Sequence, residues 1–260
     1  MAYLSVDLKT IDGTMPVRVF QSVNTTRKGC VIFYMDAFGL RPELDDMARR
    51  YADAGYVVFL PDLYYRRKRR SFPVPARQDD PLDPEMAEAN AATTLDMTIA
   101  DSGSIVAHAV ATPSYGVTRF GAVGYCMGAR HALAAGATYG ETIKAVACLH
   151  GGKLVWDGPN SPHTFIPRLS GAIYFGFAAH DPACPDTHKS IIEQTIAAAG
   201  VRGETEHYRA AHGWTFPTRW CYDPAAAEMA FSRVLSFFDA EMSGVAWMAS
   251  TVRCSPRPSP

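Results

Sequence analysis

The sequence lacks the features that mark a membrane protein or a secreted one. Among its 260 residues, no run approaches the roughly 18 consecutive apolar residues of a membrane-spanning helix. Residues 1–7 contain neither a basic segment nor an apolar one, so we expect no signal peptide. The six cysteines form no CxxC pair and have no close spacing, which is typical of reduced cysteines. We therefore expect a cytoplasmic protein that does not partner a membrane.

An excess of charge of either sign is also missing. The 25 Lys and Arg residues nearly balance the 26 Asp and Glu residues, so net charge gives no indication of a nucleic-acid partner. The histidines and cysteines have no paired ligand spacing, so we expect no metal and no cofactor. The length and the 48% hydrophobic content are those of an ordinary globular protein. We expect one domain over residues 1–250, a disordered tail over 251–260, and a monomer or small homo-oligomer.

What the sequence does contain is a regular alternation of strand and helix patterns, which is typical of an α/β fold. Two β-rich runs, 3–9 and 15–23, flank Asp12-Gly13, which predicts a hairpin and an antiparallel start to the sheet. Further strands are expected at 30–35, 56–60, 120–125, 145–149, 172–177 and 205–209. Helices are expected from Pro42 to Gly55, over 84–111 with an interruption near 102–104, over 129–137, from an N-cap at Asp186 to Gly200, and from Asp223 onward.

The motif that carries chemistry is Gly124-Tyr125-Cys126-Met127-Gly128, which lies between a predicted strand and a predicted helix. This is the G-x-nucleophile-x-G turn in its expected context. The glycines allow a sharp turn that projects the cysteine above the sheet, and the helix start behind it favours a thiolate. The alternative is that Cys126 is one more buried small apolar residue. The flanking strand and helix favour a nucleophile.

Such a turn predicts an acid and a histidine later in the chain, in that order. Asp181 lies just beyond the strand at 172–177, at the edge of the sheet where ligands gather. Asp186 is its rival, but it is better placed as a helix N-cap. His212 follows the last predicted strand and is favoured as the base over three other histidines. These competitors are His150, His180 and His207.

These residues predict a division of labour. Asp181 orients His212, His212 takes the proton of Cys126, and the thiolate attacks an acyl carbon to give a thioester that water hydrolyses. The oxyanion is expected to be held by the N–H of Met127 and by that of Ala37, which follows the strand at 30–35.

The same residues resemble the dienelactone hydrolase family. The resemblance covers about residues 15–240 and rests on four motifs, namely Asp36-Ala37-Phe38-Gly39, Pro61-Asp62-Leu63-Tyr64, the Gly-Tyr-Cys-Met-Gly turn, and Tyr222…Ala226…Phe237-Phe238. It implies an α/β-hydrolase fold, a mostly parallel sheet with helices on both faces. It also implies hydrolysis of a small carboxylic ester or lactone by a Cys-His-Asp triad, with water as the second substrate and Tyr64 near the substrate.

Two departures from the family pattern affect the expected site. Asp36 stands where the family has a glutamate that helps to activate the thiol, and it is one methylene shorter. The two arginines that grip the substrate carboxylate in the family have no counterpart here, because residues 84–94 contain none and Phe216 occupies the second place. Trp214 and Phe216 instead suggest an apolar acyl pocket, although both could be core residues.

Some alternatives stay open on the sequence alone. A large apolar pocket near Trp214 would favour a thioesterase, and a non-catalytic relic could use Cys126 as a redox-sensing thiol or simply bind a ligand. The basic run 66–70 lies in a segment, 63–83, that reads as loop. Arg66 could bind an anionic substrate there, but a solvated loop is the favoured interpretation, and a nuclear-localisation signal is weakly supported.

Overall fold

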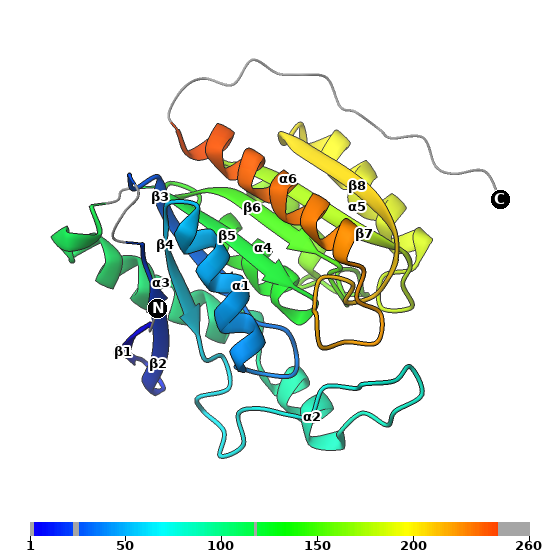
Figure 1. Ribbon diagram of the computed structural model, residues 1–260. Helices are drawn as coiled ribbons and strands as arrows, with labels where there is room; N and C mark the ends of the chain where they lie inside the picture. The colour runs from blue at the N-terminus through cyan, green and yellow to red at the C-terminus, as the bar shows by residue number, and fades with distance from the viewer. Residues whose placement is uncertain (1–2, 23–25, 117–118, 244–260) are drawn as a thin grey trace.

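The computed structural model describes residues 3–22, 26–116 and 119–243, and in them one sheet holds all eight strands (Figure 1). The order across the sheet is β1-β2-β4-β3-β5-β6-β7-β8. β1 and β2 form an antiparallel hairpin, β2 pairs antiparallel with β4, and the remaining pairs are parallel. The strands are β1 (Leu4–Thr10), β2 (Gly13–Phe20), β3 (Gly29–Tyr34), β4 (Tyr56–Pro61), β5 (Phe120–Tyr125), β6 (Ile143–Leu149), β7 (Ala172–His180) and β8 (Gly203–Ala211). The predicted fold class is confirmed.

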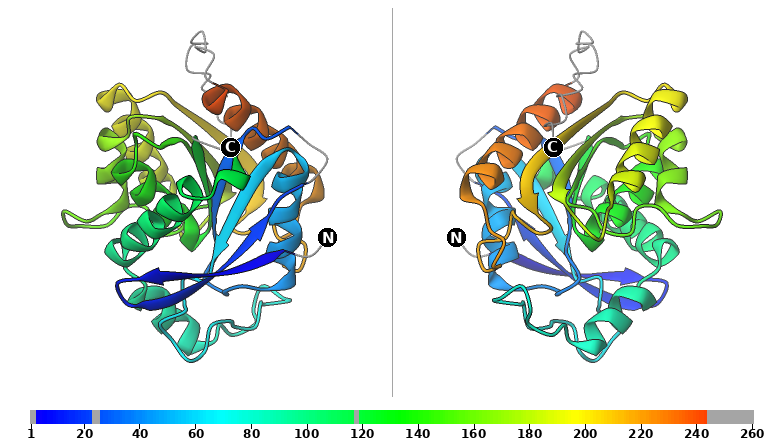
Figure 2. Two further views of the ribbon diagram at one scale, coloured as in Figure 1. Left: turned by 90° about the vertical axis from the view of Figure 1, so that its left-hand side faces the viewer. Right: turned by 90° about the vertical axis from the view of Figure 1, so that its right-hand side faces the viewer.

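Helices cover both faces of this sheet (Figure 2). α1 (Pro42–Asp53) and α6 (Pro224–Met242) lie on one face, while α3 (Leu95–Val110), α4 (Met127–Thr138) and α5 (Asp186–Ala199) lie on the other. α2 (Pro84–Ala92) precedes α3, and two short 3-10 helices span Pro113–Tyr115 and Pro162–Arg168. Every residue of the central strands β3, β4 and β5 is buried, because helices exclude water from both of their faces.

The long helical stretch at 84–111 is interrupted at Thr93-Thr94, and the prediction of a break near 102–104 was wrong. Thr94 caps α3 by accepting a hydrogen bond from the Met97 N–H, so a new helix begins there. Gly103 lies within α3, where the Tyr139 side chain occupies the space that a Cβ would need. Ser102 also fits within the helix, since its hydroxyl donates to the Thr98 carbonyl.

The start of α5 differs by one residue from the prediction. Pro185 is the N-cap, and Asp186 is the first helical residue. Its carboxylate pairs with Lys189 at 2.8 Å, so it acts within the first turn of the helix rather than capping it.

The strand ends decide where chemistry can occur. Because β3 to β8 run parallel, the residues that follow their carboxyl ends gather at one edge of the sheet. The predicted tail at 251–260 lies outside the described residues. Within the described part, no helix combines the length and the apolar character that a bilayer crossing needs.

Candidate active site

Cys126 occupies a strained turn between β5 and α4. Its φ is 54° and its ψ is −112°, a backbone conformation that non-glycine residues rarely adopt. The turn is possible because the flanking residues lack side chains. A Cβ on Gly124 would collide with the carbonyl of Gly128, and one on Gly128 would collide with the carbonyl of Tyr34. The thiol is therefore held at the amino end of α4, half-buried at the edge of the sheet.

The structure brings Cys126, His212 and Asp181 into one hydrogen-bonded line. His212 directly follows β8, and its Nε2 lies 3.1 Å from the sulfur. Its Nδ1 lies 2.7 Å from Oδ2 of Asp181, which directly follows β7. The other carboxylate oxygen accepts the Ala183 N–H at 2.8 Å. Both ring nitrogens are thus occupied, and the imidazole is fixed between thiol and carboxylate.

The electrostatics of this line favour an ion pair between cysteine and histidine. Burial raises the pKa of Cys126, but the charge of His212 and its hydrogen bond lower it, and the pKa falls below its usual value. Burial lowers the pKa of His212, but the neighbouring thiolate and Asp181 raise it to about 10. The two shifts together favour a thiolate beside an imidazolium over the neutral pair.

Tyr64 connects the two segments that carry the expected oxyanion donors. Its hydroxyl donates to the carbonyl of Ala37 at 3.0 Å and lies 3.3 Å from the sulfur of Met127. The side chain is completely buried. Tyr64 thus bridges Ala37 and Met127 and ties the two segments together, and its contact with a substrate stays a prediction.

Asp36 is occupied by an arginine rather than by the thiol. Arg41 binds its carboxylate in a bidentate manner, with distances of 2.7 and 2.9 Å, and the Phe38 N–H donates to it at 3.1 Å. Its charge still reaches Cys126, where it adds to the effect of burial and raises the pKa of the thiol, against the larger lowering effect of His212. The action of Asp36 on the thiol is therefore through space.

The three residues suggested as substrate contacts on the loops have other partners. Arg66 forms ion pairs with Asp101 at 2.8 Å and Asp12 at 2.6 Å, so its charge is already balanced. Trp214 is completely buried and stacks on Tyr208. Phe216 is equally buried, with the Arg41 guanidinium over its ring. Both aromatic side chains are core residues whose rings also pack on His150, with centroids 4.9 and 5.3 Å away, and contact of the three residues with a substrate stays a prediction.

His150 was judged a weak competitor on sequence, yet it lies against the site. It follows β6, and its ring packs edge-to-face on His212 with centroids 5.3 Å apart. Its Nε2 lies 2.8 Å from the Thr215 hydroxyl, which ties the loop after β8 to the end of β6. Burial and the neighbouring His212 hold the pKa of His150 well below its usual value, so the ring is neutral. Its position directly after the strand predicted at 145–149 was the one feature of the sequence that could have placed it at this edge of the sheet.

Arg219 is a second residue that the sequence analysis missed. Its guanidinium lies over the ring of Phe38 and against the backbone of Gly213, which adjoins His212. Its charge lowers the pKa of Cys126, after the larger effects of burial and His212. Within residues 3–22, 26–116 and 119–243 it has no ion-pair partner. An arginine seven positions after the histidine gave no signal in the sequence, because only the loop path brings it back.

The described residues contain no group of three His, Cys, Asp or Glu side chains that could hold a metal ion.

Comparison with known proteins gives a consistent result. The model of the dienelactone hydrolase family matches residues 15–242. The chain is 26% identical over 254 residues to the "Putative carboxymethylenebutenolidase" of Synechocystis sp., covering 92% of this chain and all of the relative. It is also 26% identical over 250 residues to the carboxymethylenebutenolidase of Rhodococcus opacus, covering 92% of both.

Among solved structures, the crystal structure of a "Putative Dienelactone Hydrolase" from Klebsiella pneumoniae superposes with a TM-score of 0.77. The two share 21% sequence identity, and the match covers 92% of this chain and 99% of the other. At that level of sequence identity, the structural similarity shows the fold alone.

Proposed function

The chain belongs to the dienelactone hydrolase family, and from that premise we propose that it hydrolyses a small carboxylic ester or lactone by a Cys126-His212-Asp181 triad. The observation that carries this proposal is the line of hydrogen bonds from sulfur through imidazole to carboxylate, at 3.1 and 2.7 Å. A nucleophile, a base within hydrogen-bond reach and a third group that orients the base are the parts that acyl transfer requires.

The first half of the reaction forms a thioester. The thiolate of Cys126 attacks the carbonyl carbon, a C–S bond forms, and the carbonyl electrons move onto oxygen. The N–H groups of Met127 and Ala37 stabilise this oxyanion. When the carbonyl re-forms, the C–O bond of the ester breaks, and the imidazolium of His212 gives its proton to the departing alkoxide. For a lactone, the alcohol stays tethered to the acyl group.

The second half uses water and regenerates the thiol. Neutral His212 takes a proton from a water molecule, whose oxygen attacks the thioester carbon. The C–S bond breaks, the carboxylic acid is released, and the thiolate returns to its place beside the imidazolium. Asp181 supports the imidazolium in both halves and keeps the ring in the orientation that serves sulfur and water alike.

The alternative functions have less support. A thioesterase was favoured if a large apolar pocket lay near Trp214, but this ring is fully buried against Tyr208. A redox-sensing thiol would share the lowered pKa of Cys126. Such a sensor does not need a carboxylate that orients the histidine, and the bond between His212 and Asp181 therefore favours catalysis.

The decisive experiment measures hydrolysis of a panel of p-nitrophenyl esters, enol lactones and acyl thioesters. The wild type, Cys126→Ala and Cys30→Ala are compared. Cys30 is a buried cysteine at the start of β3, at the opposite end of that strand from the site, so its variant controls for the loss of a thiol alone. We expect turnover of esters or lactones, abolished in Cys126→Ala and retained in Cys30→Ala. Rapid quenching should trap an acyl group on Cys126 by mass spectrometry.

Each contrary result has a definite meaning. Full activity in Cys126→Ala would show that the nucleophile is assigned wrongly. A wild type that turns over only thioesters would establish the thioesterase alternative. A wild type inert on the whole panel, with rapid oxidation of Cys126, would favour the sensor.

A further inference from the structure

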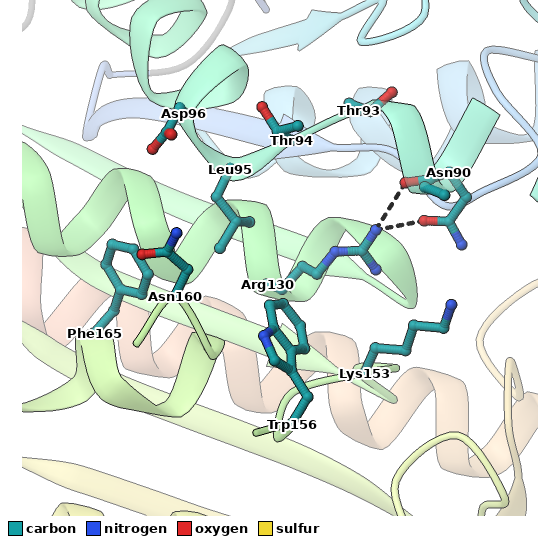
Figure 3. Close-up of a pocket in the computed structure, with 11 residues that line it drawn as sticks. Asn90, Thr93, Thr94, Leu95, Asp96, Arg130, Lys153, Trp156, Asn160 and Phe165 are labelled. Atoms are coloured by element: carbon teal, nitrogen blue, oxygen red, sulfur yellow. Dashed lines mark hydrogen bonds between the residues drawn. The ribbon is translucent and has the colours of Figure 1, made fainter. Parts of the chain in front are cut away.

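A cavity of about 340 Å³ lies between Arg130 on one side and Lys153 and Trp156 on the other (Figure 3). Its walls come from the junction of α2 and α3, from α4, and from the segment that follows β6. Cys126 is not among the residues that line it, but two links connect the cavity to Cys126. Arg130 on its wall lies one helical turn beyond Cys126 on α4, and Lys153 follows Gly152, whose N–H donates to the carbonyl of Cys126 at 3.2 Å.

Arg130 brings an unbalanced positive charge to this cavity. Its side chain extends from α4 toward Asn90 of α2, and one guanidinium nitrogen donates to the backbone carbonyl and the side-chain oxygen of that residue. Arg130 is only 7% exposed. Throughout the described residues, no carboxylate lies within ion-pair distance of it. A buried guanidinium without a counter-charge is costly, and a neutral amide compensates only part of that cost.

Lys153 supplies a second cation from the facing wall. It is exposed, and it too has no ion-pair partner in the part of the chain that the structure describes. Its backbone is strained, with a φ of 52°, and is held there by the bond from its N–H to the Ala183 carbonyl. Cys126, His150 and Lys153 are the non-glycine residues with positive φ among those described. This strain gathers around the active site, as it does where function demands a conformation.

The remaining wall is largely apolar, and one acidic residue lies on it. Trp156, Phe165 and Leu95 offer aromatic and aliphatic surface to a ligand. Asp96 stands exposed in the first turn of α3 and pairs with neither cation. The charged groups of the wall are thus two cations and one carboxylate, and the buried charge among them is positive.

We propose that this cavity is a substrate subsite, in which Arg130 and Lys153 bind a carboxylate at the far end of an elongated ester. This inference rests on the proposed hydrolase function. One turn of helix separates the Cα atoms of Cys126 and Arg130 by about 6 Å along the axis, so several bonds separate the carboxylate from the reacting carbonyl. The intervening atoms are an apolar spacer that packs against Trp156. A guanidinium whose other nitrogens are free suits a carboxylate, which accepts two N–H bonds at once.

The test compares esters that differ in one charge. The p-nitrophenyl half-ester of adipic acid carries a free carboxylate at the end of its acyl chain, and its methyl-capped twin is neutral. A second pair, the butyrate esters of 3-(4-hydroxyphenyl)propionate and of its methyl ester, places the charge on the alcohol side. We expect the wild type to prefer the charged member of at least one pair by roughly 10- to 100-fold in kcat/KM.

The variants assign that preference to the two cations. Arg130→Gln should remove most of it, measured as the ratio of the two kcat/KM values within each pair, whereas Arg130→Lys should restore part of it. Lys153→Gln should reduce the preference by about threefold, because an exposed charge contributes less. Lys9→Gln, an exposed lysine of the hairpin, is the control and should change nothing.

The outcomes separate this inference from the function on which it rests. Turnover of the neutral esters reports the hydrolase and the folded state of each variant. If the wild type hydrolyses neutral and charged twins equally in both pairs, the subsite is refuted while the hydrolase stands. If the preference survives in Arg130→Gln and in Lys153→Gln, another group binds the anion. If no ester is hydrolysed at all, the proposed function itself fails.

Discussion

Asp36 and Asp181 are two buried carboxylates near the same thiol, and each follows a different strand. They are alike in burial and in their hydrogen bond to the backbone. Each follows the carboxyl end of its strand and is at most 6% exposed. Each accepts the backbone N–H of the residue two positions on, at 3.1 Å for Asp36 and 2.8 Å for Asp181. They differ in their partners, since Arg41 binds the first and His212 binds the second.

That difference decides what each carboxylate can do. A guanidinium keeps its proton at any pH an enzyme meets, so the pair of Asp36 with Arg41 is permanently charged. An imidazole gains and loses a proton, so the pair of Asp181 with His212 can follow a reaction. Their effects on Cys126 are also opposite. Asp36 raises the pKa of the thiol through space, whereas Asp181 raises the pKa of His212, whose charge lowers that of the thiol.

The largest expected effect is the difference in activity between the variants in which each acid is replaced by its amide. Asp181→Asn should lower kcat/KM by about 10³- to 10⁴-fold, because the amide cannot support an imidazolium. Asp36→Asn should cost far less, since no proton passes through the pair with Arg41. Steady-state hydrolysis of one good ester, with circular dichroism to confirm folding, measures both. Equal losses would mean that Asp36 takes part in the chemistry directly.

For the free energy of unfolding we expect the opposite order, with the larger loss on replacing Asp36. Asp36→Ala leaves the Arg41 guanidinium mostly buried, with Glu43 as its remaining partner at 2.7 Å. We expect a loss of about 3 kcal/mol in the free energy of unfolding, measured by urea denaturation. Adding Arg41→Met should recover part of it, because the unpaired charge is then gone. Purely additive losses would show that the pair is not coupled.

The smallest expected effect is a shift in the pKa of Cys126, whose direction should differ between the two acid variants. Alkylation of Cys126 by iodoacetamide should titrate below the usual thiol pKa of about 8.5. Asp36→Asn should move that midpoint to lower pH, and Asp181→Asn to higher pH. Arg219→Gln should move it slightly upward, because the guanidinium lowers the pKa of the thiol. Shifts of the same sign in the two acid variants would show that Asp36 and Asp181 do not have opposite effects on the pKa of the thiol.

The raised pKa of His212 also predicts a stability window. The proton on His212 is bound more tightly in the folded state than in the unfolded state. Its contribution to the free energy of unfolding is therefore complete below pH 6.5 and is lost as the pH rises through about 10.

The sequence predicted those features that local pattern controls. Gly124 and Gly128 define the turn around Cys126, and chain order with strand position selected Asp181 and His212, which the structure brings within hydrogen-bond distance. The strands and most helices followed from apolar periodicity. Such signals are local, because they depend on neighbours within one or two turns of chain.

Charge partners separated by long stretches of chain could not be predicted. On the sequence alone, Arg66 could either bind an anionic substrate or lie in a solvated loop, whereas in the structure it pairs with Asp12 and Asp101. Arg219 and Arg130 gave no signal, because a position beside Cys126 depends on loop and helix packing. Trp214 was ambiguous for the same reason, since a large ring after a strand can face either a pocket or the core.

The bridge made by Tyr64 affects how the energy of substrate binding is used. Its hydroxyl joins the segment of Ala37 to Met127 on α4, so these segments lose their conformational freedom when the protein folds. In the proposed mechanism, where the Ala37 and Met127 amides hold the oxyanion, an arriving substrate need not supply the entropy of ordering these segments. Binding energy remains available for the tetrahedral transition state, where it raises kcat instead of only lowering KM. Because of the buried Tyr64 side chain, these segments are ordered when the chain folds, and part of the entropic cost of catalysis is met before a substrate binds.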